Sequence, residues 1–351
     1  MRIKPCIVSV LTVLLLLCCG KTVSPSDVPD APDGPASQID TATFWRTVYK
    51  PLKVMSFNIL IYHASDTGSV HWNYRKPACV AMIKDIAPDI IGLQECLESQ
   101  FKELLAALPE YEGVSIPKSL SNFGTCILWR KERFSCTWSG FRWYSDNPSV
   151  PSPAWPDICD DPTYRTYIWA DLHIKDSDAM VYVYDTHFPR NYTADAPNNE
   201  ARLRCSQAIV DHASGRIAGD AVVFAAGDFN CSLADGAGAA SLAPLCDWMN
   251  SSRESLPADR RDDYRSQNAF NTLCPMPGGR NSIDQIYYRN VLPVSYRTVW
   301  QPYEGVRFLS DHYPVLFECQ IECMEKVYGQ GTATLEGFPE GASLKSCVSY
   351  K

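Results

Sequence analysis

The pattern of apolar and polar positions predicts many short strands separated by a few helices. Continuous apolar runs indicate buried strands, strict alternation indicates half-buried strands, and apolar residues three and four apart indicate helices. The expected strands cover residues 52–60, 90–95, 111–114, 126–130, 134–141, 165–174, 179–187, 221–226, 283–288, 294–299 and 314–321. The expected helices cover residues 74–87, 99–108, 198–218 and 241–249.

The order of these elements favours two packed sheets over a strictly alternating parallel fold. Strands 126–130 and 134–141 are expected to pair with each other, as are strands 165–174 and 179–187. Paired strands with few helices between them indicate two sheets packed face to face, with the helices outside. The loop 142–163 contains five prolines and is too long for a simple connector, so we expect it to shape a binding site.

The N-terminus has the composition of an export signal. Arg2 and Lys4 precede an apolar stretch, residues 7–17, that is too short to be a comfortable membrane span. The next residues resemble a bacterial lipoprotein cleavage site, with Cys19 as the lipidated residue. Cys18 and an ordinary secretory signal are the alternatives, and each of them still predicts export.

Composition divides the remaining chain into a tether and a folded part. Residues 20–43 are rich in Pro, Ser and Asp and cannot form a core. We therefore expect a signal over residues 1–19, a tether over 20–43 and one domain over 44–351, held at the bacterial envelope through Cys19. The role of residues 322–351 stays open.

Charge and cysteine usage restrict the partners. The formal net charge is −8, and loss of residues 1–19 with their two cations makes it −10. Because nucleic-acid binding depends on Lys and Arg that neutralise phosphates, nucleic acid is a possible but disfavoured partner, and we expect a monomer. Twelve cysteines follow Cys19 without regular spacing, which predicts mostly buried thiols, a few disulfides and no zinc site.

Several expected strands end in polar residues that could carry chemistry. Taken singly, each has a structural explanation, since Gly, Asp and Asn form turns and a lone His is commonly a satisfied core residue. Polar groups at the ends of several buried strands together indicate the floor of a cleft. These residues are Asn58, Glu95, His187, Asp228, Asn230, Asp284, Asp311 and His312.

Six segments around these residues, in this order, resemble the endonuclease/exonuclease/phosphatase family. They read MSFNI, IIGLQE, DTHF, AAGDFN, SIDQIYY and LSDHYPV, and the resemblance extends over residues 52–321. It implies an α/β fold of the α+β kind, a four-layer α/β/β/α sandwich of two packed mixed β-sheets with outer helices. It also implies a hydrolase that cleaves a phosphodiester or phosphomonoester with a divalent metal, Mg²⁺ or Mn²⁺.

The resemblance implies a role for each residue at the strand ends. Glu95 matches the principal metal-ligating glutamate, with Asn58 and Asp311 at the same edge. Hard cations such as Mg²⁺ take carboxylate and carbonyl oxygens, which fits these residue types. The catalytic residues would be Asp228 as the base for the attacking water, Asn230, the phosphate donor His312, its partner Asp284, and His187.

Two arginines are candidates for phosphate binding, and two positions depart from the family pattern. Arg165 is expected at the transition-state oxygens, with a salt bridge as the alternative, and Arg202 has a similar place. Gly124-Thr125 replaces a Glu that supports the first histidine in the deoxyribonuclease branch, and Ser282 stands where nucleases commonly have Arg.

The substrate and the activity itself leave alternatives open. A nucleic acid, a phospholipid or sphingolipid head group, and a phosphorylated sugar, inositol or nucleotide are each compatible with the residues. The alternative to an enzyme is a surface lipoprotein that binds a ligand on the same scaffold without catalysis.

Overall fold

The computed structural model describes residues 43–117, 124–193 and 197–328, and their strands form two sheets of six. The first sheet contains β1 (Thr43–Asn58), β2 (Ile90–Gln94), β3 (Tyr111–Ser115), β4 (Thr125–Arg130), β11 (Leu292–Thr298) and β12 (Val315–Tyr328). The second contains β5 (Phe134–Trp143), β6 (Thr166–Ile174), β7 (Met180–His187), β8 (Val222–Asp228), β9 (Asn250–Ser251) and β10 (Asp284–Arg289).

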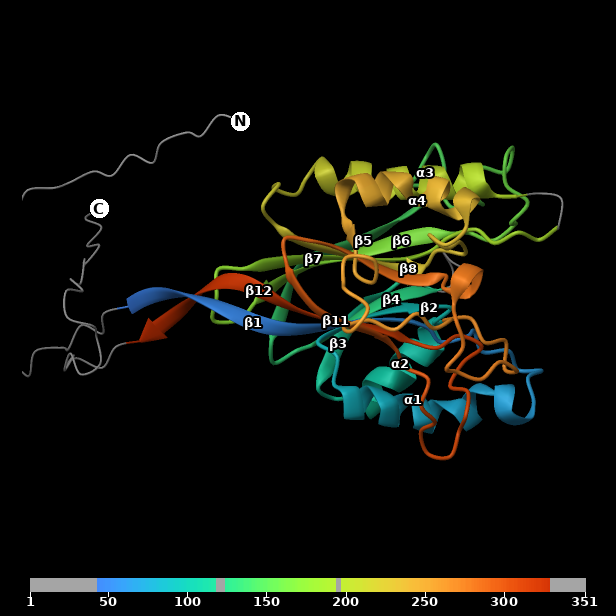
Figure 1. The fold of residues 1–351 in the computed structure, drawn as a ribbon, viewed down its shortest axis with the longest axis horizontal. Coiled ribbons are helices and arrows are strands. Elements are labelled where there is room, and N and C mark those ends of the chain that lie inside the picture. The colour runs from blue at the N-terminus through green and yellow to red at the C-terminus, as the bar shows by residue number, and fades with distance from the viewer. Residues whose placement is uncertain (1–42, 118–123, 194–196, 329–351) are drawn as a thin grey trace, which may run out of the picture. The chain divides into compact units, whose positions relative to one another are not determined.

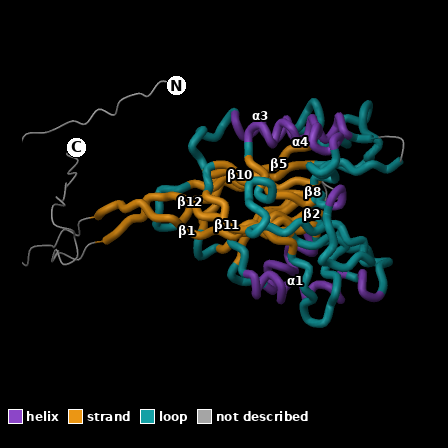
Figure 2. The backbone as a smooth tube through the Cα atoms, in the orientation of Figure 1, coloured by secondary structure: helices purple, strands orange, loops and turns teal. Residues whose placement is uncertain are grey.

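Helices cover the outer faces of both sheets. Those on the first sheet are α1 (Trp72–Ile86) and α2 (Glu98–Ala107), and those on the second are α3 (Asn199–Ser214) and α4 (Gly236–Trp248), as Figure 1 shows. Two short 3₁₀ turns, η1 (Gly68–Val70) and η2 (Gly279–Asn281), lie in loops. The tube in Figure 2 shows the strands in the middle and the helices outside. The expected four-layer sandwich is confirmed.

Each sheet has a parallel pair of strands at its centre. The orders are β11-β12-β1-β2-β4-β3 and β5-β6-β7-β8-β10-β9. The central pairs β1–β2 and β7–β8 run parallel, whereas the other neighbours run antiparallel, so both sheets are mixed. Because parallel strands end at the same edge of a sheet, each sheet presents the carboxyl ends of its two central strands together.

The layer between the sheets changes from apolar to polar along the central strands. Val54, Ile90, Val183 and Phe224 belong to one buried apolar cluster between the sheets. Towards the carboxyl ends of the same strands, inward positions become polar while staying buried. Alternation along each strand places residues two apart on the same face, so the apolar core and the polar end share one layer.

One expected strand pairing is wrong. β4 pairs with β2 and β3 in the first sheet, whereas β5 pairs with β6 in the second, so residues 126–130 and 134–141 are not partners. Residues 131–133 carry the chain from one sheet to the other. The apolar pattern indicates which face of a strand is buried, but not which strand lies beside it. The pairing of β6 with β7 is confirmed.

The first and last strands of the described chain are longer than expected. β1 and β12 pair from Thr43 with Tyr328 to Ser56 with Val315, and this pair extends beyond the sandwich in Figure 1. Trp45 and Tyr49 are about half exposed there. The extension therefore has no pattern of buried apolar residues by which the sequence could predict it. Residues 1–42 and 329–351, which include the expected signal and all of the expected tether except Thr43, lie outside the described residues.

The described cysteines are free thiols, and most of them are buried, as expected. The expected disulfides are not found among these described cysteines. Within the described ranges, no helix is long and apolar enough to span a bilayer.

We predict that Phe317→Ala lowers the free energy of unfolding by about 3 to 5 kcal/mol, since it opens a cavity between the sheets. Phe317 is fully buried, stacks on Tyr288 with ring centroids 5.0 Å apart, and meets Phe224 edge-on. Chemical denaturation measures the change. Tyr74→Ala is the control, because this exposed side chain on α1 should contribute less than about 0.5 kcal/mol. Equal losses for both variants would contradict the assignment of the core.

Candidate active site

The four central strands bring polar side chains to one end of the sandwich. Asn58 is the last residue of β1, Glu95 follows β2, and His187 and Asp228 end β7 and β8. Asn58, His187 and Asp228 are buried, and Glu95 is partly exposed. The structure therefore brings these four predicted residues to the same end of the sandwich.

The Asn58 amide joins the two sheets. Its Nδ2 lies 3.0 Å from Asp228 Oδ2 and 3.4 Å from Glu95 Oε1, so one amide donates to a carboxylate from each sheet. Its Oδ1 accepts a hydrogen bond from the Leu60 backbone N–H at 3.1 Å. Such an amide fixes both carboxylates relative to each other.

Two residues of the site adopt the left-handed backbone conformation. Glu95 has φ 59° and Asn230 has φ 50°. The turn at Glu95 lets Oε2 accept from the Ile61 N–H at 3.1 Å, while Asn230 donates its own N–H to Asp228 Oδ1 at 2.9 Å. The Asn230 side chain also donates to the Phe188 carbonyl at 2.9 Å. Such conformations cost energy for non-glycine residues and are concentrated at functional sites.

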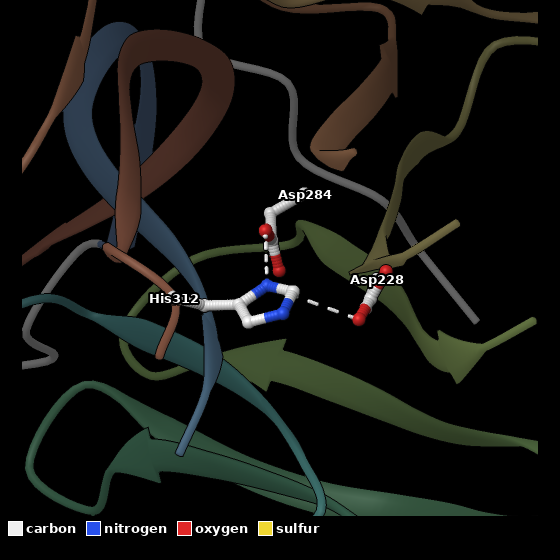
Figure 3. A group of neighbouring side chains, drawn as sticks. All are labelled: Asp228, Asp284 and His312. Carbon is white, nitrogen blue, oxygen red and sulfur yellow. Dashed lines mark hydrogen bonds and ion pairs between the residues drawn. The ribbon is translucent and has the colours of Figure 1, made fainter. Parts of the chain in front are cut away.

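His312 and Asp284 form a buried ion pair beside Asp228. His312 Nδ1 lies 2.7 Å from Asp284 Oδ2 and 3.9 Å from Asp228 Oδ2. Figure 3 shows the His312 ring between the two carboxylates. Burial lowers the pKa of His312, but the charges of Asp284 and Asp228 outweigh it and raise the pKa well above its usual value. This arrangement favours the cationic form of His312, and the contact with Asp284 fixes the orientation of its ring.

Asp228 and His187 have opposite perturbations. Burial, followed by the negative charge of Asp284, raises the pKa of Asp228 to about 7. Burial, followed by the positive charge of Arg165, lowers the pKa of His187 well below its usual value. His187 Nε2 lies 3.4 Å from Asp228 Oδ2. A carboxylate with a pKa near neutrality next to a neutral imidazole suits a general base.

The two candidate arginines make structural contacts. Arg165 is buried and its Nε donates to Asp161 Oδ2 at 2.8 Å, so the salt-bridge alternative describes its position. Arg202 Nε donates to the Pro189 carbonyl at 2.8 Å, and its other nitrogens bond Asn191 and Asn199. Phosphate binding by either arginine stays a prediction.

The residues fit a divalent cation on the side of Glu95. Glu95 and Asp228 place carboxylate oxygens at the end of the sheets, and Mg²⁺ prefers such ligands, whereas the Asn58 amide faces both carboxylates with its Nδ2. Asp228, Asp284 and His312 also offer ligand atoms within 4.8 Å of one another. A protonated His312 has no lone pair for a metal, so this second group is better suited to a hydrogen-bonding role.

Asp311 does not join the buried group of Asp228, Asp284 and His312. Its side chain is partly exposed and accepts from Ser310 Oγ at 3.1 Å, while its backbone carbonyl accepts from the N–H groups of Asn268 and Ala269. Asp311 therefore lies at the edge of the site, and its role as a metal ligand stays a prediction.

Sequence reasoning missed residues that hold the backbone of the site. The Arg75 guanidinium, fully buried in α1, donates to the carbonyls of Ile59 and Leu309 at 2.7 and 2.8 Å, which lie next to Asn58 and close to Asp311. Gln100 in α2 donates to the Leu60 carbonyl at 3.0 Å. Their partners are backbone atoms of distant segments, and no local motif reveals such contacts.

Ser266 was also missed, and it supports the Asp284–His312 pair. Its Oγ accepts from the N–H groups of Ile283 and Asp284 at 3.1 and 3.0 Å, and its carbonyl accepts from the Tyr313 N–H at 2.7 Å. One residue thus fixes the backbone on both sides of the ion pair.

Comparison with known proteins identifies the family of this chain. The sequence profile of the Endonuclease/Exonuclease/phosphatase family matches residues 55–312, which contain every candidate site residue. The chain belongs to this family. Members of the family are hydrolases of phosphoester bonds and generally depend on a divalent metal.

Individual relatives of the family are distant. A family protein from Bacteroides vulgatus is 25% identical, with a TM-score of 0.65, over 78% of this chain and 99% of that one. A mannosyl-6-phosphatase from Bacteroides thetaiotaomicron VPI-5482 is 23% identical, with a TM-score of 0.62, over 79% of this chain and 100% of that one. An uncharacterized protein of Acanthamoeba polyphaga mimivirus is 25% identical over 51% of this chain and 67% of that protein.

We predict that Asp228→Asn makes the metal-free protein more stable at pH 8, by about 2 kcal/mol. Since the folded pKa of Asp228 is raised to about 7, the folded state holds this proton more tightly than the unfolded state. The contribution of Asp228 to the free energy of unfolding is therefore largest at low pH and falls as the pH rises to 7, because the buried side chain then ionises. Asn does not ionise, so the variant avoids this loss. Thermal unfolding in EDTA at pH 5 and pH 8 measures the difference. A wild-type Tm that is higher at pH 8, with no gain from the substitution, would contradict the prediction.

Proposed function

We propose that the protein is a phosphoesterase that uses Mg²⁺ or Mn²⁺, exported to the bacterial envelope and tethered there through a lipidated Cys19. The observation that supports this proposal most directly is the contact of Glu95, Asn58 and Asp228 across the two sheets, beside the Asp284–His312 ion pair. It combines a base, the imidazolium of His312 and carboxylate oxygens for a metal at one end of the sandwich.

Each residue has a defined task in the proposed reaction. Asp228 accepts a proton from the attacking water, which Asn230 helps to hold. His312, kept cationic by Asp284, donates to a phosphate oxygen as negative charge builds there. Glu95 and Asn58, with Asp311 further out, would hold a divalent cation, which would supply positive charge to the phosphate oxygens. His187 is a second, neutral hydrogen-bonding group for the phosphate.

We propose a small phosphate ester as the substrate, and a monomer as the active form. The acidic charge of the chain disfavours a long nucleic acid, although the family includes nucleases. Purified protein should hydrolyse at least one member of a panel of p-nitrophenyl phosphate, bis(p-nitrophenyl) phosphate, mannose 6-phosphate, inositol phosphates, sphingomyelin and single-stranded DNA. Loss of turnover in EDTA would support a metal-dependent phosphoesterase. A folded protein that neither turns over the panel nor binds Mn²⁺ would support the non-catalytic alternative.

Cys19→Ser should move the protein from the membrane fraction to the soluble fraction.

We predict that Glu95→Gln weakens Mn²⁺ binding at least about tenfold and abolishes hydrolysis, because an ionised oxygen ligand becomes a neutral amide. Titration with Mn²⁺ measures the affinity, and the Tm checks the fold. Glu200→Gln on α3 is the matched control, since its exposed side chain pairs only with Arg204 at 3.0 Å among the described residues. Unchanged Mn²⁺ affinity in Glu95→Gln would remove Glu95 from the metal site.

We predict that Asp284→Asn lowers the pKa of His312 and slows hydrolysis by about two to four orders of magnitude. The charge of Asp284 helps keep the folded His312 pKa above its usual value, so the imidazolium is present below that pKa and is lost as pH rises through it. With a neutral partner this loss should move to lower pH, which NMR titration of the His312 ring measures. An unchanged His312 titration in the variant would show that another group holds the charge.

A further inference from the structure

A second buried polar group lies between the sheets, directly behind the site. Ser56 from β1, Gln94 from β2 and Asp185 from β7 all have zero exposure. Gln94 Nε2 lies 2.6 Å from Asp185 Oδ1 and 3.2 Å from Ser56 Oγ. We call these three residues the inter-sheet clasp, because they are hydrogen-bonded across both sheets.

Each residue of the clasp is a near neighbour of a site residue on its own strand. Ser56 precedes Asn58 by two positions, and Asp185 precedes His187 by two, so each pair shares the inward face of its strand. Gln94 directly precedes Glu95. A shift of one sheet against the other at the clasp therefore moves Asn58 and Glu95 relative to His187.

The sheets approach closely at the clasp because the facing residues are small. A Cβ on Gly92 would lie 2.3 Å from Asp185 Oδ1 and 3.2 Å from the Ala226 Cβ. The Asp185 carboxyl thus occupies the space that a side chain at position 92 would need. Glycine at this position permits the contact, and the carboxyl fills the gap.

The surroundings of Asp185 favour its uncharged form. Asp185 has no cationic partner among the residues that the structure describes, and an unpaired buried carboxylate is costly. Burial raises the pKa of Asp185 well above its usual range, although the Gln94 amide and the backbone N–H groups of Thr186 and Cys126 lower it in part. A neutral acid keeps the contact with Gln94 in either orientation of that amide, as acceptor from Nε2 or as donor to Oε1.

We propose that Asp185 is a positioning residue, which as an uncharged acid holds Gln94 and Ser56 and so sets the spacing between the two halves of the site. This inference rests on the proposed function, because the readouts of spacing include metal binding and turnover. Asp185 does not touch the substrate in this proposal. It acts through the strands that carry Glu95 and His187.

The test compares a conservative and a disruptive substitution at Asp185 in the full chain. Asp185→Asn keeps the shape, the neutrality and the polar contact, so Mn²⁺ affinity and kcat/KM should stay within about threefold of wild type. Asp185→Leu keeps a similar volume without polar atoms, so both quantities should fall about tenfold or more, since misplacement by a fraction of an ångström is costly at a metal or catalytic site. Gln94→Met removes the amide from the other side and should reproduce this loss, even if Asp185→Leu does not fold.

A matched control separates positioning from loss of core packing. Val181→Ala lies on the same strand at the other end of the buried layer, so it should lower the Tm without a change in Mn²⁺ affinity. The ¹⁵N shifts of the His187 ring should change in Asp185→Leu and Gln94→Met but stay near wild type in Asp185→Asn.

The outcomes distinguish this inference from the proposed function. Absence of both Mn²⁺ binding and turnover in the wild-type protein would reject the proposed function, and the His187 shifts would then still decide whether the clasp positions the site. Equal losses in Asp185→Asn and Asp185→Leu would overturn the inference, because they would show that a neutral polar side chain cannot replace Asp185 and that its negative charge is needed. Wild-type affinity, turnover and His187 shifts in folded Asp185→Leu and Gln94→Met would also overturn it.

Discussion

The hydrogen bonds of the Asn58 amide constrain the whole arrangement, because the site is divided between two sheets. Glu95 follows β2 of the first sheet and Asp228 ends β8 of the second, and one amide donates to both at 3.4 and 3.0 Å. The two sheets must therefore keep a fixed separation and a fixed relative position. Arg75 supports this arrangement from α1, because it holds the carbonyl of Ile59 immediately after Asn58. The outer helices thus contribute to the site through backbone contacts as well as by covering the sheets.

The polar end of the inner layer opposes stability, and the apolar end supports it. Asp228 and Asp284 are both nearly fully buried, and their charges are compensated by one cation, His312. This imbalance, added to burial, raises the pKa of Asp228 to about 7. The large apolar cluster that includes Phe224 and Phe317 lies between the same sheets and supplies burial in compensation. The buried Asp228 carboxyl, which we propose as the base, is thus a source of local instability that the rest of the layer has to outweigh.

The sequence revealed the residues at strand ends better than the contacts that hold them. Asn58, Glu95 and Asp228 were predictable because each follows an apolar run, and the topology then brings such ends together. The pairing of β4 was not predictable, since a strand that is apolar on the correct face fits beside several neighbours. Ser266 was not predictable either, because it acts by accepting backbone N–H groups from residues that the fold alone brings near. Local patterns report burial and backbone conformation, whereas such contacts depend on the whole topology.

The two histidines of the site show how neighbours, more than burial, assign charge. His187 and His312 are similarly buried, so desolvation lowers the pKa of both. His312 has Asp284 at 2.7 Å and becomes a cation. His187 experiences the positive charges of Arg165 and His312, which add to the effect of burial and keep it neutral. The cationic His312 suits the stabilisation of developing negative charge on a phosphate oxygen, whereas the neutral His187 leaves the nearby Asp228 free to accept a proton. The main difference between the two imidazoles is therefore the Asp284 carboxylate, which lies beside only His312, and the charge of Asp228 adds to its effect on the pKa of His312.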